Sequence, residues 1–287
     1  MKVVKLLLLC SLPILLWSCA TTPPGTQTSQ PTEKRVALVI GNNSYTNFRK
    51  SDQLEKAVKD AQDMRDQLRK LGFRVYYGEN LPISDMRAQL TKFTSEIDGN
   101  TLAFVYYSGH GTSDERGLNY LVPSDYKKEG VKPVVKTSLV AVDEIAFAMK
   151  ERGSSKNILA LDMCRSIGEE DAKNGKGSKA LSKGDIGTHS PYNKGDFKDD
   201  GVLVSYATGQ GSSSFEVNEL PNGRYTHFLL KHIKDETLSL SDLFAKVGDE
   251  VTKISGKQQI PWKNGSLEGN DIFLAKTAMS SEMGSRP

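Results

Sequence analysis

Cysteine is scarce in this chain, with three residues among 287, and histidine is nearly as rare, with four. Neither sign of charge dominates, because 38 lysines and arginines stand against 35 aspartates and glutamates, a formal net charge of +3. So small an imbalance gives no indication that nucleic acid or another general polyanion is a partner. Internal repeats are lacking as well. The length allows one large domain or two small ones.

The chain also lacks an apolar run long enough to cross a bilayer comfortably. Leu6 to Leu16 is apolar but short and interrupted by Pro13, and the positively charged segment Met1 to Lys5 precedes it. These features favour an export signal over a transmembrane helix. Leu16-Trp-Ser-Cys19 resembles the lipobox of bacterial lipoproteins, which implies that Cys19 carries lipid and anchors the protein in the bacterial cell envelope. The alternative is an ordinary signal peptide that is cut nearby.

The composition divides the chain into segments. A stretch rich in Thr, Pro, Gln and Ser follows Cys19 and is typical of a disordered tether. A second polar stretch, rich in Lys, Gly, Asp and Ser, interrupts the apolar periodicity and is long for a connection inside a domain. We therefore predict a signal peptide over 1–18, a tether over 19–34, a folded domain over 35–275 (a larger part 35–165, a flexible loop 166–200 and a smaller part 201–275), and a disordered tail over 276–287.

The three cysteines have different predicted fates. Cys10 would be removed with the signal peptide and Cys19 would be lipidated, so Cys164 is the one thiol left and no intramolecular disulfide can form. In an oxidising compartment a lone thiol is a liability unless it is buried or reactive. The alternative to a reactive Cys164 is a small side chain that packs in the core.

Apolar runs alternate with segments of helical spacing along the predicted domain. This β-α-β-α-β order is typical of an α/β fold with a parallel sheet and helices on both faces. The predicted strands are 36–40, 73–77, 102–107, 158–161 and 201–207, with a short ribbon at 119–123 and a last strand at 272–274. The predicted helices are one from about 54 to 71 capped by Ser51 or Asp52, one from Ser84 to Ile97, one over 142–151, one through Phe228 and Ile233, and one from Ser241 to Ile254.

Polar residues follow two of the buried strands directly. Asp162, Met163, Cys164 and Arg165 come after the strand at 158–161, and Ser108-Gly-His-Gly111 comes after the strand at 102–107. The carboxyl ends of parallel strands are where ligands bind in such sheets. A thiol that acts as a nucleophile needs a base beside it, and His110 is the histidine that follows a predicted strand. A single histidine in a loop is otherwise more often a surface residue.

These two segments resemble the histidine and cysteine motifs of the caspase/metacaspase superfamily of cysteine peptidases, including their separation of roughly fifty residues. Arg35 to Asn43 is similar to the first strand of that family, and Leu54 to Ala61 is similar to the first helix of its bacterial members. The resemblance implies a six-stranded, mainly parallel sheet flanked by helices. It also implies a cysteine endopeptidase in which Cys164 is the nucleophile and His110 the general acid and base. The backbone N–H groups of Gly111 and Cys164 are the natural oxyanion donors.

The resemblance also bears on specificity. Ser205 to Glu216 resembles the segment in which animal caspases carry the arginine that holds a P1 aspartate, and Glu216 occupies the matching position here. Asp162 matches the acidic residue that lines the S1 pocket of metacaspases. We therefore predict Asp162, Ser214 and Glu216 as substrate-binding residues and Lys or Arg at P1. The alternative for Glu216 is a solvated loop charge.

Other interpretations remain open at this point. A catalytically silent caspase-like module that binds envelope partners would have the same fold, and a peptidase of the legumain or separase kind shares the two-strand layout. No pattern indicates a cofactor or a resident metal, and the sequence says nothing about a calcium requirement. The expected partners are a peptide or protein substrate and, through the lipid, a membrane. The loop at 166–200 is lysine-rich and is expected to be a self-processing site, the alternative being a solvated loop that is only disordered.

Overall fold

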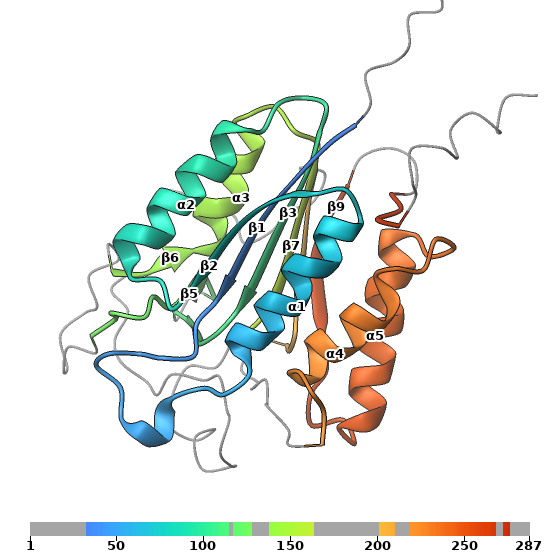
Figure 1. Cartoon of the computed structure of the whole chain (residues 1–287). Helices are drawn as coiled ribbons and strands as arrows, with labels where there is room; N and C mark the ends of the chain where they lie inside the picture. Colours follow the sequence, from blue (N-terminus) through green and yellow to red (C-terminus); the bar gives the residue numbers. More distant parts are fainter. Residues whose placement is uncertain are drawn as a thin grey trace, which may run out of the picture. The chain divides into compact units, whose positions relative to one another are not determined.

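A six-stranded sheet forms the centre of the protein (Figure 1). The computed structural model describes residues 33–114, 117–127, 138–163, 201–209, 219–267 and 272–275. The strands in spatial order are β2 (Arg74–Glu79), β1 (Lys34–Gly41), β3 (Thr101–Ser108), β7 (Lys156–Asp162), β8 (Val202–Tyr206) and β9 (Trp262–Ser266). All neighbouring pairs are parallel except β8 and β9. The predicted fold class is confirmed.

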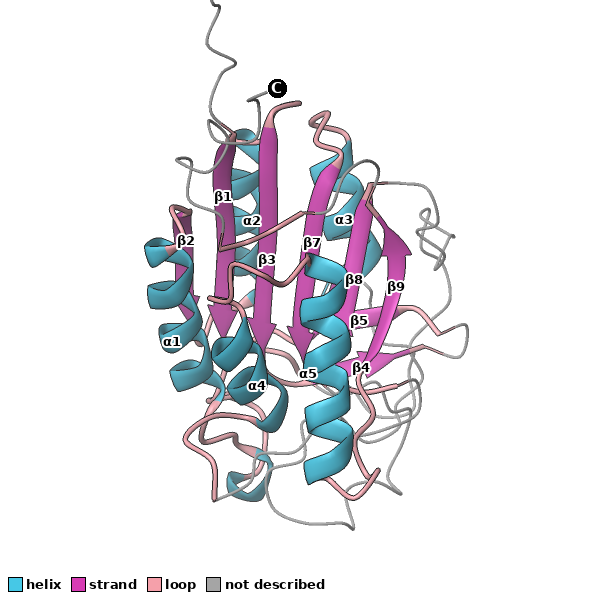
Figure 2. Ribbon diagram, turned by 90° about the vertical axis from the view of Figure 1, so that its right-hand side faces the viewer, coloured by secondary structure: helices cyan, strands magenta, loops and turns pink. Residues whose placement is uncertain are grey.

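Helices cover both faces of this sheet (Figure 2). On one face lie α2 (Ile83–Ser95) and α3 (Val142–Lys150), and on the other lie α1 (Ala57–Lys70), α4 (Arg224–His232) and α5 (Leu240–Ile254). Successive side chains of a strand point to opposite faces, so β1 contributes Val36 and Leu38 to one core and Ala37 and Val39 to the other. Burial on both faces explains why the central strands are continuous apolar runs.

A second, smaller sheet begins directly after His110. Its antiparallel strands are β4 (Gly111–Ser113), β5 (Asn119–Leu121) and β6 (Val140–Ala141). The ribbon predicted at 119–123 is therefore confirmed as β5. The loop that carries His110 lies between the end of β3 at Ser108 and the start of β4 at Gly111. The large sheet therefore holds one end of this loop and the small sheet holds the other.

The predicted start of the first helix is wrong. Ser51 and Asp52 belong to a short 3-10 turn, η1 (Lys50–Asp52), and α1 begins five residues later at Ala57. The side chain of Asn43 takes the place of a local cap, because its Oδ1 accepts a hydrogen bond from the N–H of Val58 at 2.9 Å. Because Asn43 caps α1, the residues between Asn43 and α1 are not needed as a cap and can fold around His110.

Two other helix starts and the last strand also differ from the prediction. Ser239, not Ser241, caps α5 by accepting a hydrogen bond from Asp242 N–H. The helix predicted from Ser84 begins at Ile83, whose N–H donates to Asp125 Oδ1 at 2.9 Å. The last strand is β9, and 272–275 joins no sheet. The carbonyl of Leu274 instead accepts a hydrogen bond from the Arg35 side chain at 2.6 Å, and that of Ile272 accepts one from Leu240 N–H at 2.7 Å, so isolated hydrogen bonds rather than a strand ladder hold this segment.

Several predicted features lie outside the described residues. They are the signal peptide, Cys19 and most of the tether, the loop at 166–200 and the tail at 276–287. Within the described ranges, no helix combines the length and the apolar character needed to cross a membrane.

Candidate active site

His110 lies at the carboxyl edge of the large sheet, two residues beyond the end of β3. The β3 strand is buried along its whole length, and its last residue, Ser108, is in register with Asp162 of β7. Gly109 N–H then donates to the backbone oxygen of Asp162 at 3.3 Å. This bond ties the loop that carries His110 to the strand that leads to Cys164, so the two predicted motifs share one edge.

The imidazole of His110 has a defined orientation. Its side chain is almost completely buried, and Nε2 lies 2.7 Å from the backbone oxygen of Asp52. A carbonyl oxygen can only accept, so Nε2 must be the donor in this bond. In the neutral ring the lone pair therefore resides on Nδ1, which is the nitrogen that can take up a proton.

The small sheet decides the direction of the Gly111 N–H group. Val122 N–H donates to the backbone oxygen of His110 at 3.1 Å, and Asp114 N–H donates to that of Leu118 at 2.9 Å, so the hydrogen bonds of this ladder fall at His110–Val122 and at every second pair after it. The following pair of this antiparallel ladder, Gly111 and Leu121, is then of the alternate kind, in which N–H groups point away from the partner strand. The N–H of Gly111 thus points away from β5, as an oxyanion donor would have to.

Two buried carboxylates lie at the same edge, on the face covered by α1 and α4. Asp60 of α1 accepts hydrogen bonds from Gly223 N–H at 2.9 Å and from Ser108 Oγ at 3.1 Å. Asp162 accepts from the hydroxyl and the N–H of Thr226, at 2.7 and 3.3 Å. Both carboxylates thus meet the start of α4, whose dipole favours negative charge there.

Both carboxylates affect the pKa of one buried tyrosine, Tyr106. Burial raises the pKa of Tyr106 well above its usual value, and the negative charges of Asp60 and Asp162 raise it further. The Tyr106 hydroxyl is hydrogen-bonded to Thr226, the same residue that binds Asp162. Asp60 and Asp162 therefore both contribute negative charge to the region between β3, α1 and α4.

The sequence analysis identified Asp162 but did not assign Asp60 to the site. A signal was present, because Asp60 is a charged residue on the buried face of α1, beside Ala57, Ala61 and Met64. A fully buried carboxylate needs partners. Of the other predicted residues, Cys164, Arg165, Ser214 and Glu216 lie outside the described residues, and the segment that leads to Cys164 is described as far as the buried Met163.

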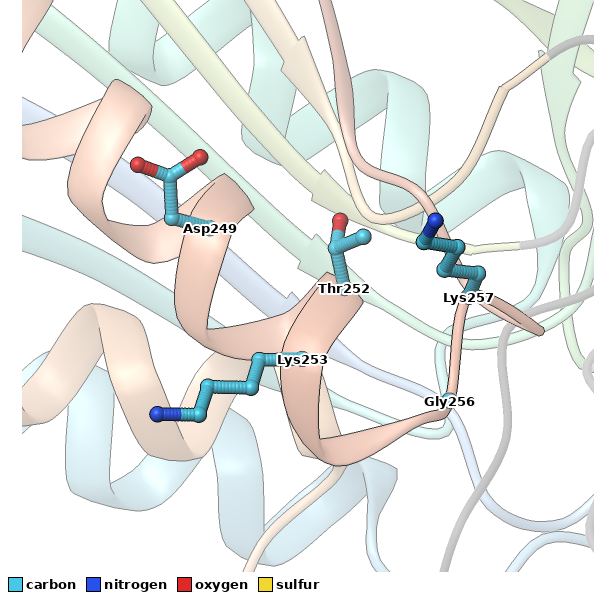
Figure 3. Close-up of a pocket in the computed structure, with 5 residues that line it drawn as sticks. All are labelled: Asp249, Thr252, Lys253, Gly256 and Lys257. Carbon is cyan, nitrogen blue, oxygen red and sulfur yellow. The ribbon is translucent and has the colours of Figure 1, made fainter.

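A metal site and a surface hollow are two other kinds of functional site that the described chain could contain. No group of three or more His, Cys, Asp or Glu side chains within the described ranges is placed to hold a metal ion. A hollow of about 480 Å³ lies at the C-terminal end of α5, lined by Asp249, Thr252, Lys253, Gly256 and Lys257 (Figure 3). It shares no residue with the candidate site, and neither a cysteine nor a histidine is among these lining residues.

Comparison with known proteins covers nearly all of the described chain. A family profile described as "Caspase domain" matches residues 34–270. The human mucosa-associated lymphoid tissue lymphoma translocation protein 1 is 26% identical over 254 residues, which are 88% of this chain and 28% of that protein. Its mouse homolog is 26% identical over 262 residues, 91% of this chain and again 28% of the relative. The chain therefore spans little more than a quarter of the length of these relatives.

Similarity to solved structures supports the architecture. The crystal structure of a protein from Geobacter sulfurreducens superposes with a TM-score of 0.57 at 14% sequence identity, covering 82% of this chain and 95% of that protein. At this identity the similarity shows the fold alone.

Proposed function

The chain belongs to the caspase-domain family of cysteine peptidases, and from this premise we propose that it is an endopeptidase with Cys164 as nucleophile and His110 as general acid and base. The observation that carries the proposal is the orientation of His110. Its Nε2–H is held by the Asp52 carbonyl, so that Nδ1 is the basic nitrogen, and its loop is hydrogen-bonded to the strand that leads to Cys164.

The proposed reaction has two steps. In the first, the thiolate of Cys164 attacks the scissile carbonyl carbon while its proton resides on His110 Nδ1. The backbone N–H groups of Gly111 and Cys164 stabilise the oxyanion that forms. The C–N bond then breaks, the leaving amine takes the proton from His110, and a thioester remains. In the second step His110 removes a proton from water, the hydroxide attacks the thioester, and Cys164 is released as the thiol.

We further propose that the enzyme cleaves after Lys or Arg. The buried carboxylates of Asp60 and Asp162 support this preference, because a cationic P1 side chain at this edge would form charge-assisted hydrogen bonds with them. A P1 aspartate would instead add a third negative charge to the same region, which costs free energy at short range. Ser214 and Glu216 belong to the same proposal from the sequence.

The test of the mechanism is hydrolysis of fluorogenic peptides by purified wild type, Cys164→Ala and His110→Ala. Both variants are expected to lose activity by a factor of about 10³ or more, since each removes a member of one catalytic unit. His227→Ala is the control, because His227 lies on α4 and contacts Phe228 rather than the site. Thermal melts should show that all variants remain folded.

Two outcomes would contradict the proposal in different ways. Undiminished hydrolysis by Cys164→Ala would exclude the cysteine mechanism. A folded wild-type protein that hydrolyses no peptide and does not react with a thiol-directed peptide electrophile would favour the catalytically silent binding module instead.

A further inference from the structure

We propose that Tyr45 is a positioning residue for His110, which it holds through both its hydroxyl group and its ring. The inference rests on the proposed function, because it assumes that His110 is the base. Tyr45 lies in the segment between β1 and α1, far from His110 in sequence, and its side chain is buried. The consequence is that removal of one oxygen atom from Tyr45 should impair proton transfer without affecting substrate binding.

The first contact is with the backbone of His110. Tyr45 Oη accepts a hydrogen bond from His110 N–H at 2.7 Å and donates to the backbone oxygen of Asn42 at 3.2 Å. On the other side of the same residue, the Tyr107 hydroxyl donates to the His110 carbonyl at 2.8 Å. Two tyrosine hydroxyls therefore hold the N–H and the C=O of His110, which determines where its Cα–Cβ bond points.

The second contact is with the imidazole itself. The rings of Tyr45 and His110 have centroids 4.6 Å apart at an angle of 55°, and Phe48 lies 5.3 Å from the same imidazole. Tyr45 and Phe48 are stacked on each other at 4.9 Å. With Nε2 bonded to the Asp52 carbonyl, the aromatic contacts leave the imidazole little freedom to rotate.

Tyr45 is in turn held by the segment that contains Asp52. The Gln53 side chain accepts a hydrogen bond from Tyr45 N–H at 2.7 Å and donates to the backbone oxygens of Tyr45 and Phe48 at 3.0 and 3.2 Å. The residues from Tyr45 to Gln53 thus form one hydrogen-bonded unit. This unit contains the hydroxyl, the rings and the carbonyl that contact His110, so all of these contacts come from one segment.

The glycine before His110 is independent support for this arrangement. A Cβ atom placed on Gly109 would meet Tyr45 Oη at 2.8 Å and would meet the Tyr107 hydroxyl at a still shorter distance. Real Cβ atoms essentially never approach other atoms so closely. The first glycine of Ser108-Gly-His-Gly111 is therefore required by the two hydroxyl groups, in addition to any need for open space beside a substrate.

Tyr45 also belongs to a cluster of buried apolar side chains with Tyr120 and Tyr126, so a purely structural role is the alternative. Tyr120 supplies a matched control. Its side chain is buried in the same cluster, and its hydroxyl donates to Asp114 Oδ2 at 3.2 Å rather than to His110. Each Tyr→Phe substitution removes one buried hydroxyl and keeps the ring.

The kinetic experiment compares Tyr45→Phe with Tyr120→Phe. For Tyr45→Phe we expect kcat to fall by about 10-fold to 100-fold with KM within about twofold of wild type, because a small misplacement of a catalytic group has effects of this size. Tyr120→Phe should keep both constants within about twofold. Equal values of kcat for Tyr45→Phe and wild type would overturn the inference.

A second measurement does not depend on activity. Nitrogen-15 chemical shifts of the histidine ring distinguish the two neutral tautomers, and His110 of the wild type should be protonated on Nε2. Tyr45→Phe should show a mixture of tautomers or a broadened signal, and Tyr120→Phe should not. If the wild type hydrolyses nothing, the proposed function fails, yet the spectra still decide whether Tyr45 positions His110. Unchanged spectra in Tyr45→Phe would sink the inference.

Discussion

Asp60 and Asp162 support the start of α4, and we propose that they also contribute to specificity. Their carboxylates accept hydrogen bonds from backbone N–H groups at the start of α4, a helix whose N-cap, Gly223, has no side chain to do so. They therefore do for α4 what a capping residue does for other helices. The same negative charge at the sheet edge is what we propose attracts a basic P1 side chain.

A charge-removing substitution separates these two roles. Asp60→Asn keeps an oxygen that can accept from Gly223 N–H but removes the negative charge. We expect kcat/KM for peptides with Arg or Lys at P1 to fall by a factor of about 30 or more, which corresponds to the 2–5 kcal/mol lost when a buried charge partner is removed. Peptides with a neutral P1 residue should be affected much less.

The control for this prediction is Asp63→Asn. Asp63 lies one turn further along α1, accepts from Asn222 and pairs with the exposed side chain of Lys59, so it is outside the buried region. It should leave kcat/KM for all peptides within about twofold. Unchanged cleavage after Arg by Asp60→Asn would refute the assignment of Asp60 to the P1 pocket.

At the scale of elements, α3 carries a charge that its surroundings disfavour. Asp143 lies in the first turn of α3 and is almost completely buried, and its Oδ2 has no hydrogen-bond partner among the residues that the structure describes. Burial raises the pKa of Asp143, and the nearby charge of Asp114 raises it further, to about 6. The position at a helix N-terminus favours the charge but does not offset its burial.

This pKa predicts a pH-dependent effect of Asp143→Asn on stability. The folded-state pKa lies above the ordinary value of 3.8, so the native protein binds the proton more tightly than the unfolded chain does. Stability from this group is therefore fully present below about pH 3.8 and is lost as the pH rises through about 6. Asp143→Asn should increase the free energy of unfolding by about 3 kcal/mol at pH 7.5, since the pKa is raised from 3.8 to about 6, and change it little at pH 4.

Urea unfolding at the two pH values measures this difference, with Asp85→Asn as the control. Asp85 also lies in the first turn of a helix, α2, but its side chain is exposed. Its substitution should have a small effect that is similar at both pH values. A loss of stability in Asp143→Asn at pH 7.5 would mean that the charged form of Asp143 has a partner that stabilises it.

At the scale of the whole molecule, the chain enters the sheet at the edge opposite the candidate site. The β1 strand begins at Lys34, and His110 follows the far end of the neighbouring parallel strand β3. Eight residues of strand span about 26 Å. The start of β1 is therefore a full strand length from His110.

We propose that Cys19 is the lipidated N-terminal residue, and the prediction concerns its substitution. Cys19→Ser should abolish lipid attachment and move the protein from the membrane fraction to the soluble fraction. Peptidase activity per molecule should stay within about twofold, because β1 begins a strand length away from His110. Mass spectrometry of the mature N-terminus provides the measurement, and an unmodified N-terminus at another residue in the wild type would disprove the anchor.

The sequence alone determined those features that depend on local pattern. Continuous apolar runs predicted the four parallel strands β1, β3, β7 and β8, because strands that are buried on both faces need apolar residues at nearly every position. The edge strand β2 is only partly buried, and it was predicted from the shorter segment 73–77. The residues after 102–107 and 158–161 predicted which sheet edge carries His110 and Asp162. These inferences succeed because side-chain direction follows from the strand period and because parallel strands end at one edge.

Only the tertiary structure decided which distant groups meet there. Nothing local in the sequence says that the Asp52 carbonyl orients His110, that Tyr45 holds its backbone or that Asp60 joins Asp162 at the start of α4. The predicted cap of the first helix, Ser51 or Asp52, was wrong for the same reason, since the cap of α1 comes from Asn43, two residues after β1. Hydrogen bonds between segments that are far apart in the chain leave no periodic trace, so they appear only once the chain is folded.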